Sequence, residues 1–144
     1  METIKNQGMK KIIPPFLFLC CIVIMVVVRN LIVIQEIIPK LFNYLGVFLI
    51  ITGIVITIKV RKQFEKMDTE IHTFKKPRKL VTNGLFKISR NPIYLGFTIS
   101  LIGVWFILGS ILPIIGCLLF FIVSNNFYIP NEERTMEKTF GSEY

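Results

Sequence analysis

The chain has 144 residues, of which 53% are hydrophobic and 18% charged, with a formal net charge of +8. Soluble domains carry about 25% charged residues and fewer apolar ones, so this composition and the mean hydropathy of +0.64 predict a small integral membrane protein. Intrinsic disorder, a collagen-like repeat and a large multidomain enzyme are excluded.

Four apolar stretches predict an all-α bundle of about four transmembrane helices, folded as a single domain over residues 1–144. Each stretch is close to the ~20 residues that cross a hydrocarbon core of ~30 Å. The first has no small-residue cleavage site and three more spans follow it, so we interpret it as a mature helix. Arg29, near its end, is expected to reach the membrane interface. The stretches are 12–28 (extending to 34 past Arg29), 41–60, 93–108 and 111–129.

Lysine and arginine are concentrated between the second and third spans, which predicts that this segment and both termini are cytoplasmic. Within it, Phe64, Met67, Ile71 and Phe74 recur three or four residues apart, as in an amphipathic helix at the headgroup level. We expect this basic segment to contact the lipid bilayer rather than nucleic acid, because it lies beside membrane spans.

Cysteine and histidine give no sign of a metal site or a disulfide framework. Cys20, Cys21 and Cys117 all lie within apolar runs, and His72 is the one histidine. No cluster with metal-ligand spacing results, so we expect no bound metal.

Only Gly109 and Ser110 separate the third and fourth spans, which predicts a tight helical hairpin. The two open ends of such a hairpin meet at one membrane surface, so polar residues that are distant in sequence should converge there. One end carries Ser89, Arg90, Asn91, Pro92 and Tyr94, and the other carries Asn125, Asn126, Asn131, Glu132 and Glu133.

Each of these ends has the pattern of a helix start. Asn91 can cap a helix and Pro92 suits its first position, while Pro130 and Asn131 predict another helix with Glu132 and Glu133 in its first turn. Taken singly, these features are explained by capping and by the helix dipole. Acting together, helix amides, a tyrosine and a carboxylate suit a ligand with a carboxylate, a cationic centre and a ribose, such as S-adenosylmethionine.

Several motifs in the second half of the chain resemble the isoprenylcysteine carboxyl methyltransferase family, within the phospholipid methyltransferase-like superfamily. They are Leu80-Val81-Thr82-Asn83-Gly84-Leu85-Phe86, Ser89-Arg90-Asn91-Pro92-Ile93-Tyr94-Leu95-Gly96, Asn131-Glu132-Glu133 and Phe140-Gly141-Ser142-Glu143-Tyr144. The resemblance covers residues 78–144, and its specificity lies in the order and spacing of the four elements.

This resemblance implies a membrane methyltransferase that uses S-adenosylmethionine and methylates a lipid-tailed, for example prenylated, acceptor at the cytoplasmic face. By position, the cofactor-binding residues are Leu80, Val81, Asn91, Pro92, Ile93, Tyr94 and Glu132. We assign catalytic roles to Tyr94, beside the sulfonium, and to Arg90, which would orient an anionic acceptor.

Two other functions stay open at this point. A phospholipid or lipid-amine N-methyltransferase would use the same cofactor, and it needs a base for the amine proton, for which Glu133 is placed. A small membrane protein without catalytic activity would use the same caps and acids only for structure.

Overall fold

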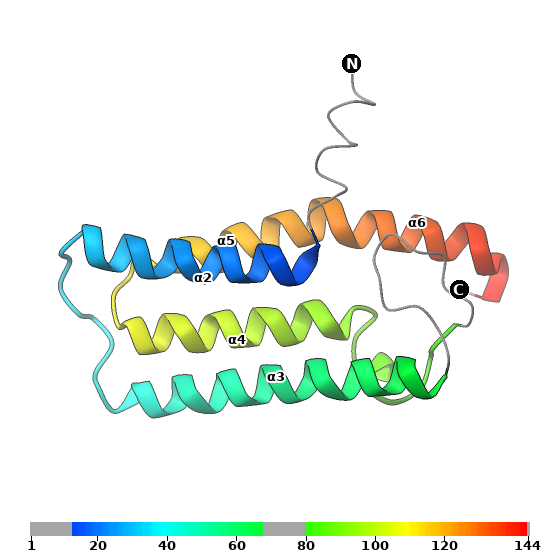
Figure 1. Cartoon of the computed structure of the whole chain (residues 1–144), viewed down its shortest axis with the longest axis horizontal. Helices are drawn as coiled ribbons and strands as arrows, with labels where there is room; N and C mark the ends of the chain where they lie inside the picture. Colours follow the sequence, from blue (N-terminus) through cyan, green and yellow to red (C-terminus); the bar gives the residue numbers. More distant parts are fainter. Residues whose placement is uncertain (1–12, 68–79, 144) are drawn as a thin grey trace, which may run out of the picture.

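The computed structural model describes residues 13–67 and 80–143, and in these ranges the chain forms helices and no strand. The expected all-α class is therefore confirmed. The long helices lie side by side along the longest axis (Figure 1). They are α2 (Pro14–Leu31), α3 (Phe42–Lys66), α4 (Pro92–Leu108), α5 (Ile114–Val123) and α6 (Ile129–Phe140). Shorter elements are the 3₁₀ turns η1 (Gly84–Lys87) and η3 (Gly141–Glu143) and the π-helix η2 (Ser124–Tyr128).

Three helical segments are long and apolar enough to cross a membrane: α2, α3 and the run Ile114–Phe140. The fourth apolar helix, α4, has 17 residues and matches the short third stretch of the sequence. Leu19, Val23, Phe48 and Ile51 are examples of the large apolar side chains that the bundle leaves on its outer surface. Such an exterior suits lipid and would be unfavourable in water, as expected of an integral membrane protein.

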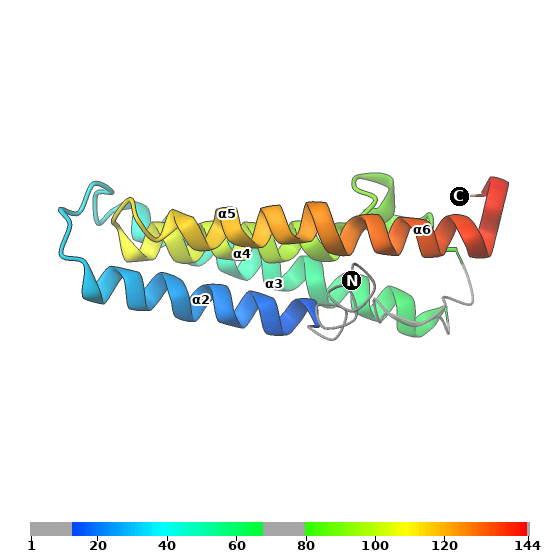
Figure 2. The ribbon, with the colours of Figure 1, turned by 90° about the horizontal axis from the view of Figure 1, so that it is seen from above.

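The expected separate helix at Pro130 is wrong. Here α5, η2 and α6 follow one another without a break and form one rod (Figure 2). A proline ring clashes with the carbonyl of the residue four positions earlier in an α-helix, here Asn126. The wider π-turn just before Pro130 relieves that clash, so the helix continues past the proline.

Helix α3 also runs further than the second apolar stretch. It reaches Lys66, so Phe64 belongs to α3, and Met67 is its C-cap. Ile71 and Phe74, the other half of the expected amphipathic helix, lie outside the described residues, as does His72.

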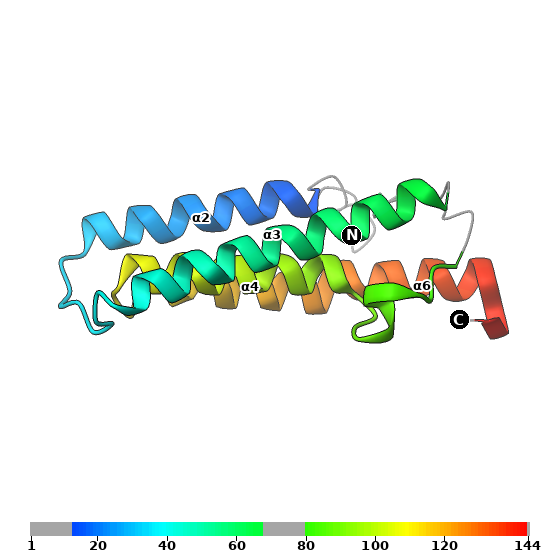
Figure 3. The ribbon, with the colours of Figure 1, turned by 90° about the horizontal axis from the view of Figure 1, so that it is seen from below.

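Helix α4 is the centre of the bundle. On one side α3 lies across it (Figure 3), and on the other side it packs against α2 and α5. The contact with α3 is close because glycines face each other: a Cβ on Gly46 would lie 2.6 Å from the carbonyl oxygen of Gly103, and one on Gly96 would lie 2.8 Å from that of Gly53. Both pairs repeat after seven residues, which keeps them on one seam of each helix.

The other side of α4 is packed with aromatic rings. Phe18 of α2 stacks on Phe97 of α4 with centroids 4.8 Å apart, and Phe120 of α5 meets both rings edge-on. Offset and edge-to-face pairs of this kind add to the stabilisation that comes from close packing. This aromatic cluster fixes how α2, α4 and α5 sit against one another.

The expected hairpin between α4 and α5 is present, but its link spans residues 109–113, because α5 begins at Ile114 and not at residue 111. Gly109 ends α4 in the left-handed conformation with φ +73°, which glycine adopts without steric cost. The indole N–H of Trp105 donates to the carbonyl of Ser110 over 2.9 Å and fastens the turn to the helix before it.

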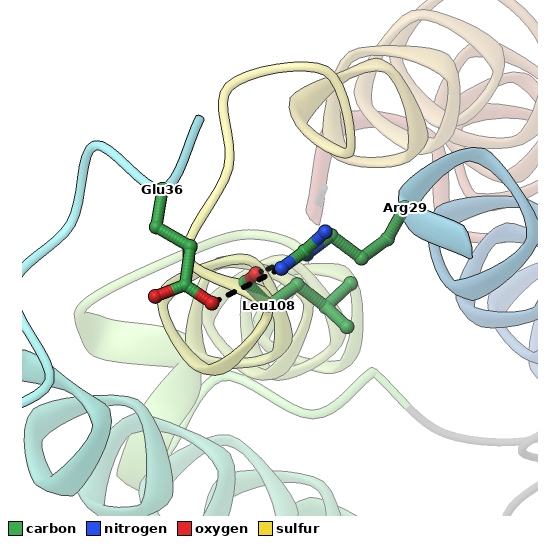
Figure 4. Close-up of polar contacts among 3 residues, drawn as sticks. All are labelled: Arg29, Glu36 and Leu108. Atoms are coloured by element: carbon green, nitrogen blue, oxygen red, sulfur yellow. Dashed lines mark hydrogen bonds and ion pairs between the residues drawn. The ribbon is translucent and has the colours of Figure 1, made fainter. Parts of the chain in front are cut away.

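Arg29 lies at the same end of the bundle as this turn (Figure 4). Its Nε donates to the carbonyl of Leu108, the last residue of α4, over 2.9 Å, and its Nη2 pairs with Glu36 over 3.1 Å. The backbone N–H groups of Ile37 and Ile38 both donate to the carbonyl of Gly109. These bonds tie the α2–α3 connection to the hairpin turn.

Candidate functional site

The start of α4 and the first turn of α6 meet at the end of the bundle opposite Arg29. The Tyr94 hydroxyl donates a hydrogen bond of 2.8 Å to Oε1 of Glu132, 38 residues away in sequence. Tyr94 is only 6% exposed and Glu132 is half-buried. The convergence that the hairpin predicted is therefore present at these two residues.

Helix α4 begins at Pro92, as the sequence predicts, but its cap is not the expected one. Asn91 occupies the N-cap position with no side-chain hydrogen bond to the first turn. Instead its backbone N–H donates to the hydroxyl of Ser89 over 3.2 Å, in a tight local turn. Pro92 is fully buried and fixes where the helix enters the bundle. The Asn91 side chain thus lies at the positive end of α4 without serving as its cap.

Tyr128 completes this end of the core, and it was not among the residues that the sequence singled out. It is 2% exposed, and its ring stacks on that of Tyr94 with centroids 6.1 Å apart and planes 24° apart. The spacing of four between Phe120, Ser124, Tyr128 and Glu132 was the available signal. This spacing did not stand out in the sequence, because a regular α-helix would not keep all four residues on one face.

Leu80 and Val81 lie in the segment that leads into η1. This segment is anchored to the end of α3, since the Gln63 side-chain amide donates to the carbonyl of Asn83 over 2.6 Å and the rings of Phe64 and Phe86 pack edge-on at 5.4 Å. Val81 is buried and Leu80 half-buried.

The other expected site residues differ in how they are placed. Ile93 is half-buried in the first turn of α4, and Glu133 is half-buried beside Glu132. Arg90 is exposed just before α4. Asn125 and Asn126 are exposed on the π-turn, and so they lie outside the buried contact between Tyr94 and Glu132.

The arrangement combines three kinds of group that can hold a small charged ligand. The start of α4 carries partial positive charge, Glu132 supplies a carboxylate, and two stacked tyrosines supply a buried aromatic wall. Most lysines and arginines of the described segments surround this same end of the bundle, where negatively charged molecules would be attracted. They are Lys59, Arg61, Lys62, Lys66, Lys87, Arg90, Arg134 and Lys138.

A separate open groove lies at the start of α3, where Lys40, Tyr44 and Val47 face Ile107 of α4. It is at the hairpin-turn end of the bundle, away from Tyr94 and Glu132. Within the segments that the structure describes, no group of three or more histidine, cysteine, aspartate or glutamate side chains is placed to hold a metal ion.

The chain was also compared with known proteins. The sequence model of the phospholipid methyltransferase family matches residues 41–143, which include α3, the hairpin and every residue of the candidate site. No curated protein and no solved structure gives a match. The matched range covers more than two thirds of the chain, and it contains the first three motifs identified in the sequence and all of the fourth except its last residue, Tyr144. The chain belongs to the phospholipid methyltransferase family.

Proposed function

We propose that this protein transfers a methyl group from S-adenosylmethionine to the head group of a lipid-tailed acceptor at the membrane surface. The observation that carries the proposal is the 2.8 Å contact between Tyr94 and Glu132, which joins two of the sequence motifs at one part-buried site within the matched range.

The residues at this site fit such a cofactor. Its carboxylate would lie at the positive start of α4, near Asn91 and the amide of Ile93, since the Asn91 side chain is not used to cap the helix. Glu132 would accept hydrogen bonds from ribose hydroxyls or from the amino group. Leu80, Val81 and Pro92 would provide apolar surface around these groups.

When bound, the cofactor would supply an electrophilic methyl group on a sulfonium. The contribution of the protein is then mainly positioning. Tyr94 would present its ring and hydroxyl to the cationic centre, and Glu132 would fix the direction of that hydroxyl. Arg90, which is exposed at the same end, would orient an anionic acceptor. Burial at Tyr94 excludes water, and so strengthens each of these electrostatic contacts.

Two classes of methyl acceptor, a carboxylate and an amine, are candidates for this site. A carboxylate acceptor, as in the carboxyl methyltransferases that the motifs resemble, is already deprotonated and needs no base. An amine acceptor is favoured by the family match, and it must lose a proton. Glu133, half-buried next to Glu132, is the residue we assign to accept that proton.

We also propose that the site end of the bundle faces the cytoplasm, together with both termini. The support is the concentration of basic residues at that end of the described chain, in contrast to only Arg29 and Lys40 at the other. Single cysteines introduced at Ser142 and at Val33 in a variant without native cysteines would test this in sealed inside-out vesicles. We expect a membrane-impermeant maleimide to label the first only, and labelling of Val33→Cys alone would reverse the orientation.

The central test is calorimetric titration of the detergent-purified protein with S-adenosylmethionine. We expect saturable binding, weakened by about tenfold to 150-fold in Glu132→Gln through loss of a charge-assisted hydrogen bond of about 1.5–3 kcal/mol. Glu137→Gln is the matched control, because Glu137 is an exposed glutamate on the same helix and should leave binding unchanged.

A folded wild-type protein that does not bind, or a Glu132→Gln variant that binds as tightly as wild type, would overturn the proposal. If binding is confirmed, methyl transfer to carboxyl-bearing and amine-bearing lipids, offered in parallel, identifies the acceptor class. Loss of activity in Glu133→Gln with the amine lipid alone would support its role as the base.

A further inference from the structure

The π-turn η2 is the one interruption of α-helical geometry between Ile114 and Phe140. Pro130 accounts for its place in the chain, because the proline ring excludes a regular α-turn over the preceding residues. Asn131 stabilises the widened turn, since its side-chain amide donates to the carbonyl of Phe127 over 2.7 Å. π-turns inserted in α-helices occur frequently at functional sites.

This turn changes which residues face α4. Residues four apart in an α-helix drift by about 40°, so Phe120 and Glu132 would differ by about 120° in direction on a regular helix. A π-turn rotates by a smaller angle per residue than an α-turn, so it removes much of this difference in direction between Phe120 and Glu132. As a result Phe120 contacts Phe97, Tyr128 contacts Tyr94, and Glu132 accepts the Tyr94 hydrogen bond, all on α4.

Ser124, the first residue of the turn, shows that this face is closed off from solvent. It is 3% exposed, and its hydroxyl has no hydrogen-bond partner in the described part of the chain. A buried hydroxyl without a hydrogen bond is unfavourable. The turn is present despite this unpaired group, and the residues that follow it, Tyr128 and Glu132, contact Tyr94 of α4.

Among those residues, Tyr128 has the most direct relation to the site. Its ring packs nearly parallel to that of Tyr94, with planes 24° apart, and Phe127 packs edge-on against it from the same turn. Because Tyr128 is 2% exposed, its ring has little room to move. It therefore supports the ring of Tyr94, and the hydroxyl of that ring donates its hydrogen bond to Glu132.

We propose that Tyr128 is a positioning residue: held by the π-turn, its ring keeps Tyr94 in place to bond Glu132 and so sets the affinity for the cofactor. This inference rests on the proposed function, because the affinity concerned is that for S-adenosylmethionine, the proposed cofactor. The supporting group is the aromatic ring, so phenylalanine should replace it and an aliphatic side chain should not.

The test is titration with S-adenosylmethionine of the full-length protein and of Tyr128→Phe and Tyr128→Leu. We expect Tyr128→Phe to bind within about threefold of wild type and Tyr128→Leu to bind about tenfold more weakly, in line with the energy of an aromatic pair. Phe120→Leu is the matched control. It removes an equally buried ring from the same face, so it should lower stability but not affinity.

A double-mutant cycle separates positioning from a general loss of structure. If Tyr128 acts through the Tyr94 hydroxyl, Tyr128→Leu should have little further effect on affinity in a Tyr94→Phe background. Additive losses, or equal binding by wild type and Tyr128→Leu, would overturn the inference while the proposed function stands. Failure of the folded wild type to bind at all would overturn the proposed function, and with it the role of Tyr128.

Discussion

Substitution of Gly103 by alanine should loosen the packing of α3 on α4. A Cβ at this position would lie 2.5 Å from the carbonyl oxygen of Gly46 and 2.9 Å from the backbone nitrogen of Ile50. Both neighbours are backbone atoms, which cannot turn aside as a side chain can, so the helices must separate. Overpacking of this kind costs about 1–3 kcal/mol, and the two backbone contacts place the cost near the upper end.

Alanine also favours the helical state over glycine by about 1 kcal/mol, which offsets part of that cost. We therefore expect Gly103→Ala to lower the free energy of unfolding by about 2 kcal/mol. The assay is SDS titration in mixed micelles, followed by the fluorescence of Trp105, the single tryptophan of the chain.

Gly116→Ala is the control for this measurement. Its added Cβ would meet the side chain of Met25, which can adopt another rotamer, and would lie 3.0 Å from the carbonyl oxygen of Cys21, against 2.5 Å for the nearest backbone atom at Gly103, so a smaller loss is expected. A Gly103→Ala protein as stable as wild type, or more stable, would refute the close backbone contact between α3 and α4.

Two further predictions concern side-chain hydrogen bonds at opposite ends of the bundle. Replacing Arg29 with methionine removes its bonds to Leu108 and Glu36, and should lower the free energy of unfolding by about 2 kcal/mol in the same SDS titration. An unchanged midpoint of unfolding would show that the α2–α3 connection is held without Arg29. Replacing Tyr94 with phenylalanine removes the bond to Glu132, which should weaken S-adenosylmethionine binding about tenfold and lower the free energy of unfolding by about 1.5 kcal/mol. Calorimetry and thermal unfolding of one sample would measure the two effects separately, and unchanged binding would contradict the assigned role of Tyr94.

The sequence by itself determined the class of the protein. Apolar runs of about 20 residues can bury their backbone polar groups in a membrane only as helices, so helical spans follow from composition alone. The short link after Gly109, which spans residues 109–113 in the structure, allows only an antiparallel hairpin. From that hairpin alone one could predict that Tyr94 and Glu132 would lie at the same end. The four ordered motifs pointed to the phospholipid methyltransferase-like superfamily, and the family match agrees with that superfamily but not with its isoprenylcysteine carboxyl methyltransferase member in particular.

Other features depend on contacts between segments that are distant in the sequence, so local patterns do not reveal them. Asn91 and Pro92 mark a helix start, yet only the surrounding structure decides that the Asn91 side chain does not cap it. Likewise, Pro130 looks like the start of a new helix. The helix continues instead through a π-turn, because packing of Tyr128 and Glu132 against α4 offsets the cost of the irregular turn. The pairing of glycines on α3 and α4 and the contact of Arg29 with Leu108 were decided in the same way, by which helix faces meet in the folded bundle.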